Sequence, residues 1–263
     1  MKTSPNSPGL ELWPLFRNLS AEQIRILRGR MLPQRVPPRT HVLRRGEHSQ
    51  ALFLVLGGTV KVTCGRTGGT RVTFGLLGQG AIIGELSAMD GKCHSADVVA
   101  IETCLLLSLR NDDVHLYMRS MPQLLRNLNE LVCHRVRVAS QLSEILAIKD
   151  LSCRVAHLLS ILAEAHGHGD TGPVRIPIRL TQNDLAEWVG SSRERVNRAL
   201  TELRKERLIA MESGYRIVVL DSNALAKRCG LSDTAAGTTP AAGTALAAEA
   251  PRKIVRKDIS LKL

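Results

Sequence analysis

The sequence predicts an α+β protein with a β-rich N-terminal domain, one long helix and a compact basic C-terminal domain, in that order. Three observations support this prediction. Residues 41–109 consist of short β-rich runs separated by glycine-containing turns. No proline or glycine stands between Pro122 and Gly167, which favours a long helical region. The chain has 263 residues, more than one hydrophobic core usually organises, so we expect two folded domains.

Residues 10–40 predict one short helix before the β-rich region. Ser20 and Gln23 have the spacing of a capping box, and Ile24 and Leu27 give the helix one apolar side. Prolines at 33, 37 and 38 are expected to end it. The β-rich runs that follow are residues 51–56, 59–64, 71–74, 95–101 and 103–109. Short strands separated by glycine-rich turns indicate a small antiparallel barrel or sandwich.

The long helix carries two apolar stripes. The first follows a 4-3 spacing, and its members are Leu124, Leu128, Leu131, Val138, Leu142 and Ile145. Only Arg135 interrupts this spacing. The second stripe consists of Leu125, Val132, Val136 and Ala139. One stripe can pack on the β-rich domain while the other pairs with a second copy of the helix, so we expect a parallel homodimer. A single helix buried on all sides is the alternative.

Charge and cysteine usage restrict the class of protein. The net charge of +12 indicates a polyanionic partner, because Lys and Arg displace the counterions condensed on phosphates. Charge alone does not separate DNA, RNA and an anionic membrane. No apolar run approaches the length of a membrane span and no signal peptide is evident, so we expect a cytoplasmic protein without a membrane partner. The six cysteines form no C-x-x-C pair, so we expect buried thiols.

Residues 181–203 have the pattern of two helices joined by a tight turn. Thr181 and Asp184 form a capping-box pattern, and Gly190 permits the turn. Ser191 and Ser192 supply the N-cap of the second helix. This arrangement is a helix-turn-helix. The pattern LIAMESGYRIVVL, which follows, is typical of a hairpin that forms the wing of a winged helix.

The second of these helices has a polar side near its start. At 100° per residue, an arc of about 140° contains Arg193, Glu194, Asn197 and Arg198. The opposite side carries Val196, Ala199, Leu200 and Leu203. Arg pairs with guanine O6 and N7, and Glu accepts a hydrogen bond from cytosine N4, so this polar side can read base edges in a major groove. We expect Ser192 and Arg195 to complete the DNA-binding set.

A second interpretation of this helix needs no DNA. Glu194 could complete a capping box with Ser191, while the arginines form a solvated helix face. The capped helix before it, the glycine turn and the hairpin after it favour DNA binding.

The order and motifs of these elements resemble the cyclic-AMP receptor protein (CRP/FNR) family of bacterial transcription regulators. The resemblance covers nearly all of residues 10–229. It implies a cyclic-nucleotide-binding-like β-roll as effector domain over 10–120 and a dimerisation helix over 121–149. A winged helix-turn-helix DNA-binding domain is then expected over 150–229. The low-complexity composition of residues 230–263 predicts a disordered basic tail.

The same resemblance implies a function. GSSRERVNRAL resembles the family's recognition helix, with Arg193, Glu194 and Arg198 at the positions that read a TGTGA-like half-site. We therefore expect a homodimer that reads a palindromic site on double-stranded DNA, acts as an activator or dual regulator and contacts RNA polymerase. A cyclic-nucleotide-binding regulatory subunit that acts through protein partners is the alternative function. No Walker-type loop, Ser-His-Asp arrangement or paired carboxylates are evident, so we expect no enzymatic activity and no catalytic residues.

An effector site is also implied by resemblance. The family's phosphate-binding cassette is matched by Gly84, Glu85, Leu86, Ser87, His94, Ser95 and Ala96. Glu85 and Ser95 fit the roles of ribose and phosphate contacts, but His94 stands where cyclic-AMP binders carry Arg. Ser140 matches an adenine-contacting position, whereas its neighbour Ala139 replaces a hydroxyl residue. Neutral His cannot offer the bidentate fork of Arg, so we expect cyclic AMP to bind weakly or not at all.

Other sensing chemistry has little support. FNR-like oxygen sensing needs an N-terminal cysteine cluster, and residues 1–40 contain no cysteine. His166, His168 and Asp170 have a spacing that could hold a metal, but they belong to a glycine-rich loop and we expect no metal there. A regulator that binds DNA without any ligand is a further alternative.

Overall fold

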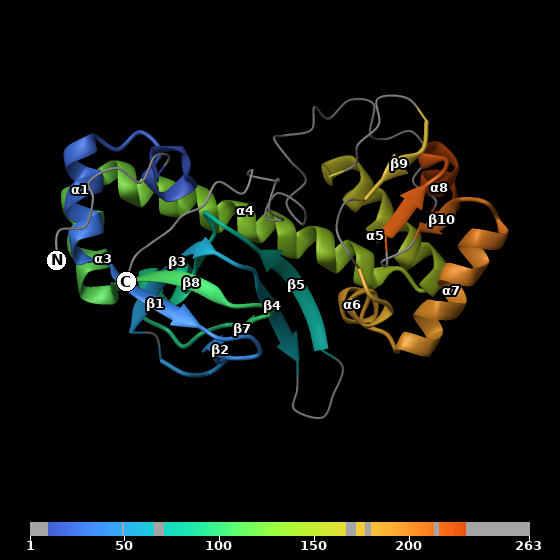
Figure 1. Ribbon diagram of the computed structural model, residues 1–263, viewed down its shortest axis with the longest axis horizontal. Coiled ribbons are helices and arrows are strands. Elements are labelled where there is room, and N and C mark those ends of the chain that lie inside the picture. The colour runs from blue at the N-terminus through green and yellow to red at the C-terminus, as the bar shows by residue number, and fades with distance from the viewer. Residues whose placement is uncertain are drawn as a thin grey trace.

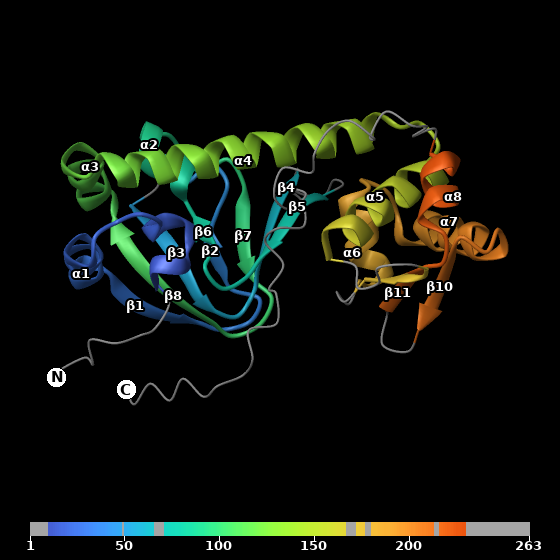
Figure 2. The same cartoon turned by 90° about the horizontal axis from the view of Figure 1, so that it is seen from above.

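The computed structural model describes residues 10–48, 50–65, 71–166, 172–176, 180–212 and 216–229. Within them the chain forms an N-terminal β-domain and a C-terminal helical domain, linked by the long helix α4 (Pro122–Ala147) (Figure 1). Figure 2 shows α4 running along one side of the β-domain and ending at the C-terminal domain. The predicted tail, residues 230–263, and the loop residues His168 and Asp170 lie outside the described residues.

The N-terminal segment contains the predicted capped helix and one unpredicted strand. Two short 3-10 helices, η1 (Leu10–Leu12) and η2 (Pro14–Phe16), precede α1 (Ala21–Arg30). Ser20 and Gln23 form the expected capping box of α1. The chain then enters β1 (Leu32–Val36), which the prolines concealed from sequence reasoning. Pro33 is tolerated because β1 is the edge strand of its sheet.

The β-domain consists of two four-stranded antiparallel sheets. Their orders are β1-β8-β3-β6 and β2-β7-β4-β5. The remaining strands are β2 (His41–Leu43), β3 (Ala51–Gly57), β4 (Val60–Gly65), β5 (Arg71–Leu77), β6 (Ile82–Ile83), β7 (Asp97–Ala100) and β8 (Cys104–Arg110). The five predicted runs correspond to β3, β4, β5, β7 and β8, so the antiparallel β-rich prediction is confirmed. Alternate side chains of both sheets meet in an apolar core that includes Val55, Leu77, Val98 and Leu106.

Two further helices complete the β-domain. The short helix α2 (Glu85–Asp90) follows β6, and Gly84 precedes it with a left-handed φ of 83°. The helix α3 (Asn111–Ser120) precedes α4 and was not predicted, although Val114, Tyr117 and Met118 have helical spacing and pack in the core of the N-terminal domain.

The two stripes of α4 have different environments. Among the first-stripe residues, Leu124 and Leu128 belong to the core of the N-terminal domain, whereas Val138 and Ile145 belong to the core of the C-terminal domain. The second stripe is open: Val136 is 60% exposed and Leu125 is 36% exposed. Within the described chain, α4 is therefore not buried on all sides, and the second stripe is the one available to a partner.

The C-terminal domain is a winged helix, as predicted. Its elements are α5 (Leu151–His166), β9 (Val174–Arg175), α6 (Gln182–Trp188), α7 (Arg193–Lys205), β10 (Ile209–Glu212), β11 (Arg216–Val219) and α8 (Ser222–Arg228). The strands form one antiparallel sheet in the order β10-β11-β9, and the helices pack together beside it (Figure 2). Leu159, Trp188, Leu200 and Ile217 lie in the shared core.

A polar contact joins the two domains directly. The Glu187 carboxylate of α6 lies 2.7 Å from Lys61 Nζ on β4 and accepts a hydrogen bond of 2.9 Å from Thr73 Oγ1 on β5. Leu76 of β5 packs against the C-terminal core beside this contact. The helix-turn-helix therefore rests on the same two strands that, on their other side, help to line the cavity described below.

Candidate DNA-reading surface and effector cavity

The turn between α6 and α7 is tight and capped. Gly190 has a left-handed φ of +60°, and an added Cβ would lie 3.2 Å from Leu146 Cδ2, so both conformation and space favour glycine there. Ser192 is the N-cap of α7 and accepts a hydrogen bond from the Arg195 backbone. Ser191 is outside the helix, so the alternative in which it forms a capping box with Glu194 is wrong.

The two sides of α7 are as different as the sequence predicted. Val196, Ala199, Leu200 and Leu203 are buried in the domain core. The six predicted DNA-binding residues are exposed, namely Ser192, Arg193, Glu194, Arg195, Asn197 and Arg198. The structure thus brings a polar group together on the outer side of α7, over its first two turns, where a recognition helix meets bases.

Glu194 is ionised at neutral pH. Its own backbone N–H and the Ser192 hydroxyl lower the pKa of its carboxyl group, and the charges of Arg193 and Arg198 lower it further. An ionised carboxylate is only a hydrogen-bond acceptor, which is the property needed to accept from cytosine N4.

Gln182, the first residue of α6, was missed by sequence reasoning. Its side-chain oxygen accepts from Arg193 Nε at 3.3 Å, and its side-chain nitrogen donates to Asn197 Oδ1 at 2.9 Å. The contacts span 11 and 15 residues of sequence, so no local pattern indicates them. They follow from the angle at which the turn places the start of α6 beside the first turns of α7.

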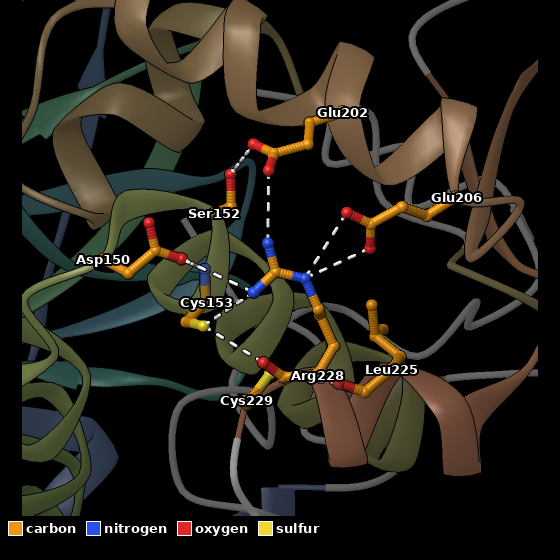
Figure 3. Close-up of polar contacts among 8 residues, drawn as sticks. All are labelled: Asp150, Ser152, Cys153, Glu202, Glu206, Leu225, Arg228 and Cys229. Atoms are coloured by element: carbon orange, nitrogen blue, oxygen red, sulfur yellow. Dashed lines mark hydrogen bonds and ion pairs between the residues drawn. The ribbon is translucent and has the colours of Figure 1, made fainter.

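The far end of α7 is held by Arg228 of α8 (Figure 3). Its guanidinium lies 3.2 Å from Glu202 on α7, 3.1 Å from Glu206 at the C-cap of α7, and 3.7 Å from Asp150 before α5. Ser152 also donates to Glu202. One arginine therefore links three helices and helps to fix the direction of α7.

The cysteines next to Arg228 are thiols. Burial raises the pKa of Cys229 to about 12 and also raises the pKa of Cys153. A raised pKa argues against reactivity, since a reactive cysteine needs a lowered pKa. The expectation of buried thiols holds for Cys104 alone: Cys64, Cys153 and Cys229 are partly buried, and it is wrong for the exposed Cys93 and Cys133.

The predicted effector residues surround a cavity of about 240 Å³ between the β-sheets and α4. It is lined by Gly84, Glu85, Leu86, Ser87, His94, Ser95 and Ala96, as predicted. Arg135, Val138 and Ala139 of α4 close it, and most of the remaining lining is apolar, including Leu43, Phe74 and Leu77. Ser140 is exposed and is not among the residues that line this cavity.

Four charged or polar side chains of the cavity lie in two pairs, Arg135 with Glu85 and Ser87 with His94. Arg135 Nε lies 3.3 Å from Glu85 Oε1, and Arg135 Nη2 donates to the Ile82 carbonyl at 2.9 Å. Ser87 Oγ lies 2.9 Å from His94 Nδ1. The sequence indicated Arg135 only as a break in the apolar stripe; its position opposite Glu85 depends on how α4 lies on the β-domain.

His94 is mainly uncharged at neutral pH. Burial lowers the pKa of its imidazole below the usual value of 6.5, against the opposing effect of Glu47 and Glu85. A neutral imidazole that contacts Ser87 cannot give an anionic phosphate the charge and the paired hydrogen bonds that an arginine guanidinium gives.

Among the described residues, no group of three or more His, Cys, Asp or Glu side chains could hold a metal ion. None of the helices in the same residues is both long and apolar enough to span a membrane.

A β-domain with an internal cavity, joined through a long helix to a winged helix-turn-helix, defines a two-domain regulator that binds DNA. Residues 33–120 match the model of the cyclic nucleotide-binding domain, and residues 153–228 match that of the Crp-like helix-turn-helix domain. The chain is 32% identical over 206 residues to the cyclic AMP receptor protein of Thermus thermophilus, covering 76% of this chain and 90% of that protein. The chain belongs to the CRP/FNR family of transcription regulators.

Other relatives agree with this assignment. A CRP-like cAMP-activated global transcriptional regulator of Mycobacterium tuberculosis is 27% identical over 214 residues, covering 81% of this chain and 95% of that protein. The fold is similar to that of CooA from Carboxydothermus hydrogenoformans, with a TM-score of 0.70 over 85% of this chain and 97% of that chain. The identity to CooA is 17%, so this likeness concerns the fold.

Proposed function

We propose that the protein is a homodimeric regulator that reads a palindromic TGTGA-like site and acts as an activator or dual regulator. The observation that carries the proposal is the exposed group of Arg193, Glu194, Asn197 and Arg198 on the first turns of α7. An acidic residue among arginines favours base reading over simple phosphate binding, because a carboxylate repels phosphates but accepts from cytosine. Ser192 and Arg195 contact the DNA phosphate backbone beside the bases that are read.

The second stripe of α4 supports the homodimer. Leu125, Val132, Val136 and Ala139 line one side of α4 and are at least partly exposed in the single chain. A second copy of the helix buries them in a parallel seam. Ser140 is one helical turn from Val136, so in this dimer it faces the partner subunit rather than the cavity of its own chain. An activator of this type also contacts RNA polymerase.

The cavity supports a weak response to cyclic AMP. The phosphate of that nucleotide needs a charge-assisted partner, whereas His94 is mainly neutral and Arg135 already pairs with Glu85. We therefore propose that specific DNA binding does not depend on cyclic AMP.

Selection of binding sites from a randomised duplex library tests this function. The full-length protein should enrich a palindrome with two TGTGA-like halves, without nucleotide, and should bind it much more tightly than random DNA. Arg193→Ala should relax the base preference at one position in each half-site while keeping salt-dependent binding to random DNA. Enrichment of no sequence would contradict DNA reading and would favour a subunit that acts through protein partners.

A further inference from the structure

The side chain of Gln182 connects two of the residues proposed to read bases. Gln182 and Arg193 are the first residues of α6 and α7, and the turn brings these two helix starts together. Gln182 contacts Arg193 on one side and Asn197 on the other, at 3.3 Å and 2.9 Å. A single amide thus spans the start of the recognition surface.

The direction of both hydrogen bonds follows from the chemistry of Arg193. Its Nε is a donor only, so the atom of Gln182 that meets it must be the amide oxygen. The amide nitrogen of Gln182 then faces Asn197, which must present its own oxygen, Oδ1. Arg193 Nε therefore determines the amide orientation of Gln182, and the orientation of Gln182 determines that of Asn197.

This orientation leaves particular groups for DNA. Arg193 uses Nε, so its two terminal nitrogens keep the geometry for a bidentate contact with guanine O6 and N7. Asn197 Oδ1 already accepts one hydrogen bond from Gln182, which favours the orientation in which Nδ2, a donor, is available to DNA. Adenine is the usual base for Asn because Oδ1 accepts from N6 while Nδ2 donates to N7. To contact adenine in this way, Oδ1 would have to accept from N6 with its second lone pair while it still accepts from Gln182, so the Asn197 amide could not turn freely into the plane of the base.

We propose that Gln182 is a positioning residue that sets base specificity, by making Asn197 select a keto base, guanine or thymine, rather than adenine. Guanine offers O6 and N7 to the Nδ2 donor, and thymine offers O4. The inference rests on the proposed DNA-reading function and adds to it the base class read by one residue. The hydrogen bonds are solvent-accessible in the free chain, and DNA that covers the surface excludes water from them and strengthens them.

Two variants of Gln182 separate its two contacts. Gln182→Glu keeps an oxygen for Arg193 but replaces the amide nitrogen that donates to Asn197. Gln182→Ala removes both contacts. Asn183→Asp is the matched control for the added charge, because it makes the same amide-to-acid change at the exposed next residue of α6.

Binding-site selection with the full-length protein tests the proposal, and Asn197→Ala identifies the base pair that Asn197 reads. The wild-type protein should enrich guanine or thymine over adenine there. Gln182→Glu should reduce this preference on the order of tenfold, the equivalent of one well-placed hydrogen bond, and should keep guanine at the Arg193 position. Gln182→Ala should relax both positions, and Asn183→Asp neither. Comparing bases within one library cancels any uniform loss of affinity.

The outcomes distinguish this proposal from the function on which it rests. If the wild-type protein enriches no sequence, DNA reading itself fails and the inference fails with it. If a site is enriched, adenine at the Asn197 position would overturn the inference alone. The same conclusion follows if Asn197→Ala changes no position, or if Gln182→Glu leaves the preference at the Asn197 position unchanged.

Discussion

The cavity of the β-domain and the outer side of α7 both hold an arginine near a glutamate, but they use the charges differently. In the cavity, Arg135 lies 3.3 Å from Glu85, and the two side chains are 18% and 8% exposed. On α7, Arg193 and Glu194 are exposed to solvent. A buried charge must be paired within the protein, whereas an exposed charge remains available to a ligand. A charged side chain at a position that binds a ligand in related proteins therefore supports ligand binding here when the protein itself does not already pair that charge.

The largest expected effect concerns the helix that links these two regions. Val136→Lys places a charge in the apolar seam of the dimer, where an unpaired charge is costly. We expect monomers and a loss of specific affinity of about 100-fold or more, since a palindrome needs both halves bound together. Light scattering and a gel shift measure the two effects.

Leu116→Lys is the control for this prediction. Leu116 lies on α3 and is 55% exposed, an exposed fraction similar to the 60% of Val136. It should remain dimeric. A Val136→Lys protein that still scatters as a dimer would place the interface elsewhere.

The next effect concerns the exposed arginine. Arg193→Ala should cost roughly 1–3 kcal/mol on the cognate site and relax the base preference at one position in each half-site. Fluorescence anisotropy with cognate and random duplexes measures both terms. An equal loss on the two duplexes would reduce Arg193 to a phosphate contact.

A smaller effect should come from restoring a charge in the cavity. His94→Arg should tighten cyclic AMP binding by roughly tenfold at neutral pH, because a charge-assisted contact replaces a neutral imidazole. In the wild-type protein, affinity should rise only as the pH falls below about 6.5 and His94 gains a proton. Calorimetry of both proteins at several pH values checks this. No gain from either change would mean that His94 does not face the phosphate.

The smallest effect is on stability. Burial lowers the pKa of His94 and of His157 in the folded protein. As the pH falls below about 6.5, the unfolded chain therefore binds more protons at these two residues than the folded protein does. Their contribution to the free energy of unfolding is complete above about pH 6.5 and decreases as the pH falls through the lower folded-state values. The Tm should therefore decrease from pH 7.5 to 5.5 by about a few degrees. His94→Gln should make this decrease smaller.

The parts that sequence predicted well are those that depend on local periodicity. The polar and apolar sides of α7, the capping boxes at Ser20 and Thr181, and the first stripe of α4 follow from residues within a few turns of one another. The strand β1 was missed because Pro33 argues against a strand unless the strand is known to be at an edge.

The parts that sequence could not predict depend on contacts between distant elements. The Arg135 side chain meets Glu85 across 50 residues, and Gln182 meets Asn197 across 15. The seven cassette residues around the cavity were found by family resemblance, which gives positions but not their pairing. Whether a charge is available to a ligand is therefore visible only in three dimensions.

The central proposal is that the outer side of α7 reads DNA without cyclic AMP, whose phosphate finds no free charged partner in the cavity. The most direct measurement is the Kd of the full-length protein for its selected palindrome, with and without saturating cyclic AMP, at pH 7.5. The account predicts tight specific binding without the nucleotide and a change of less than about twofold on adding it, since a ligand with equal affinity for the free and the DNA-bound protein shifts no equilibrium. Specific binding that appears only with cyclic AMP would contradict it.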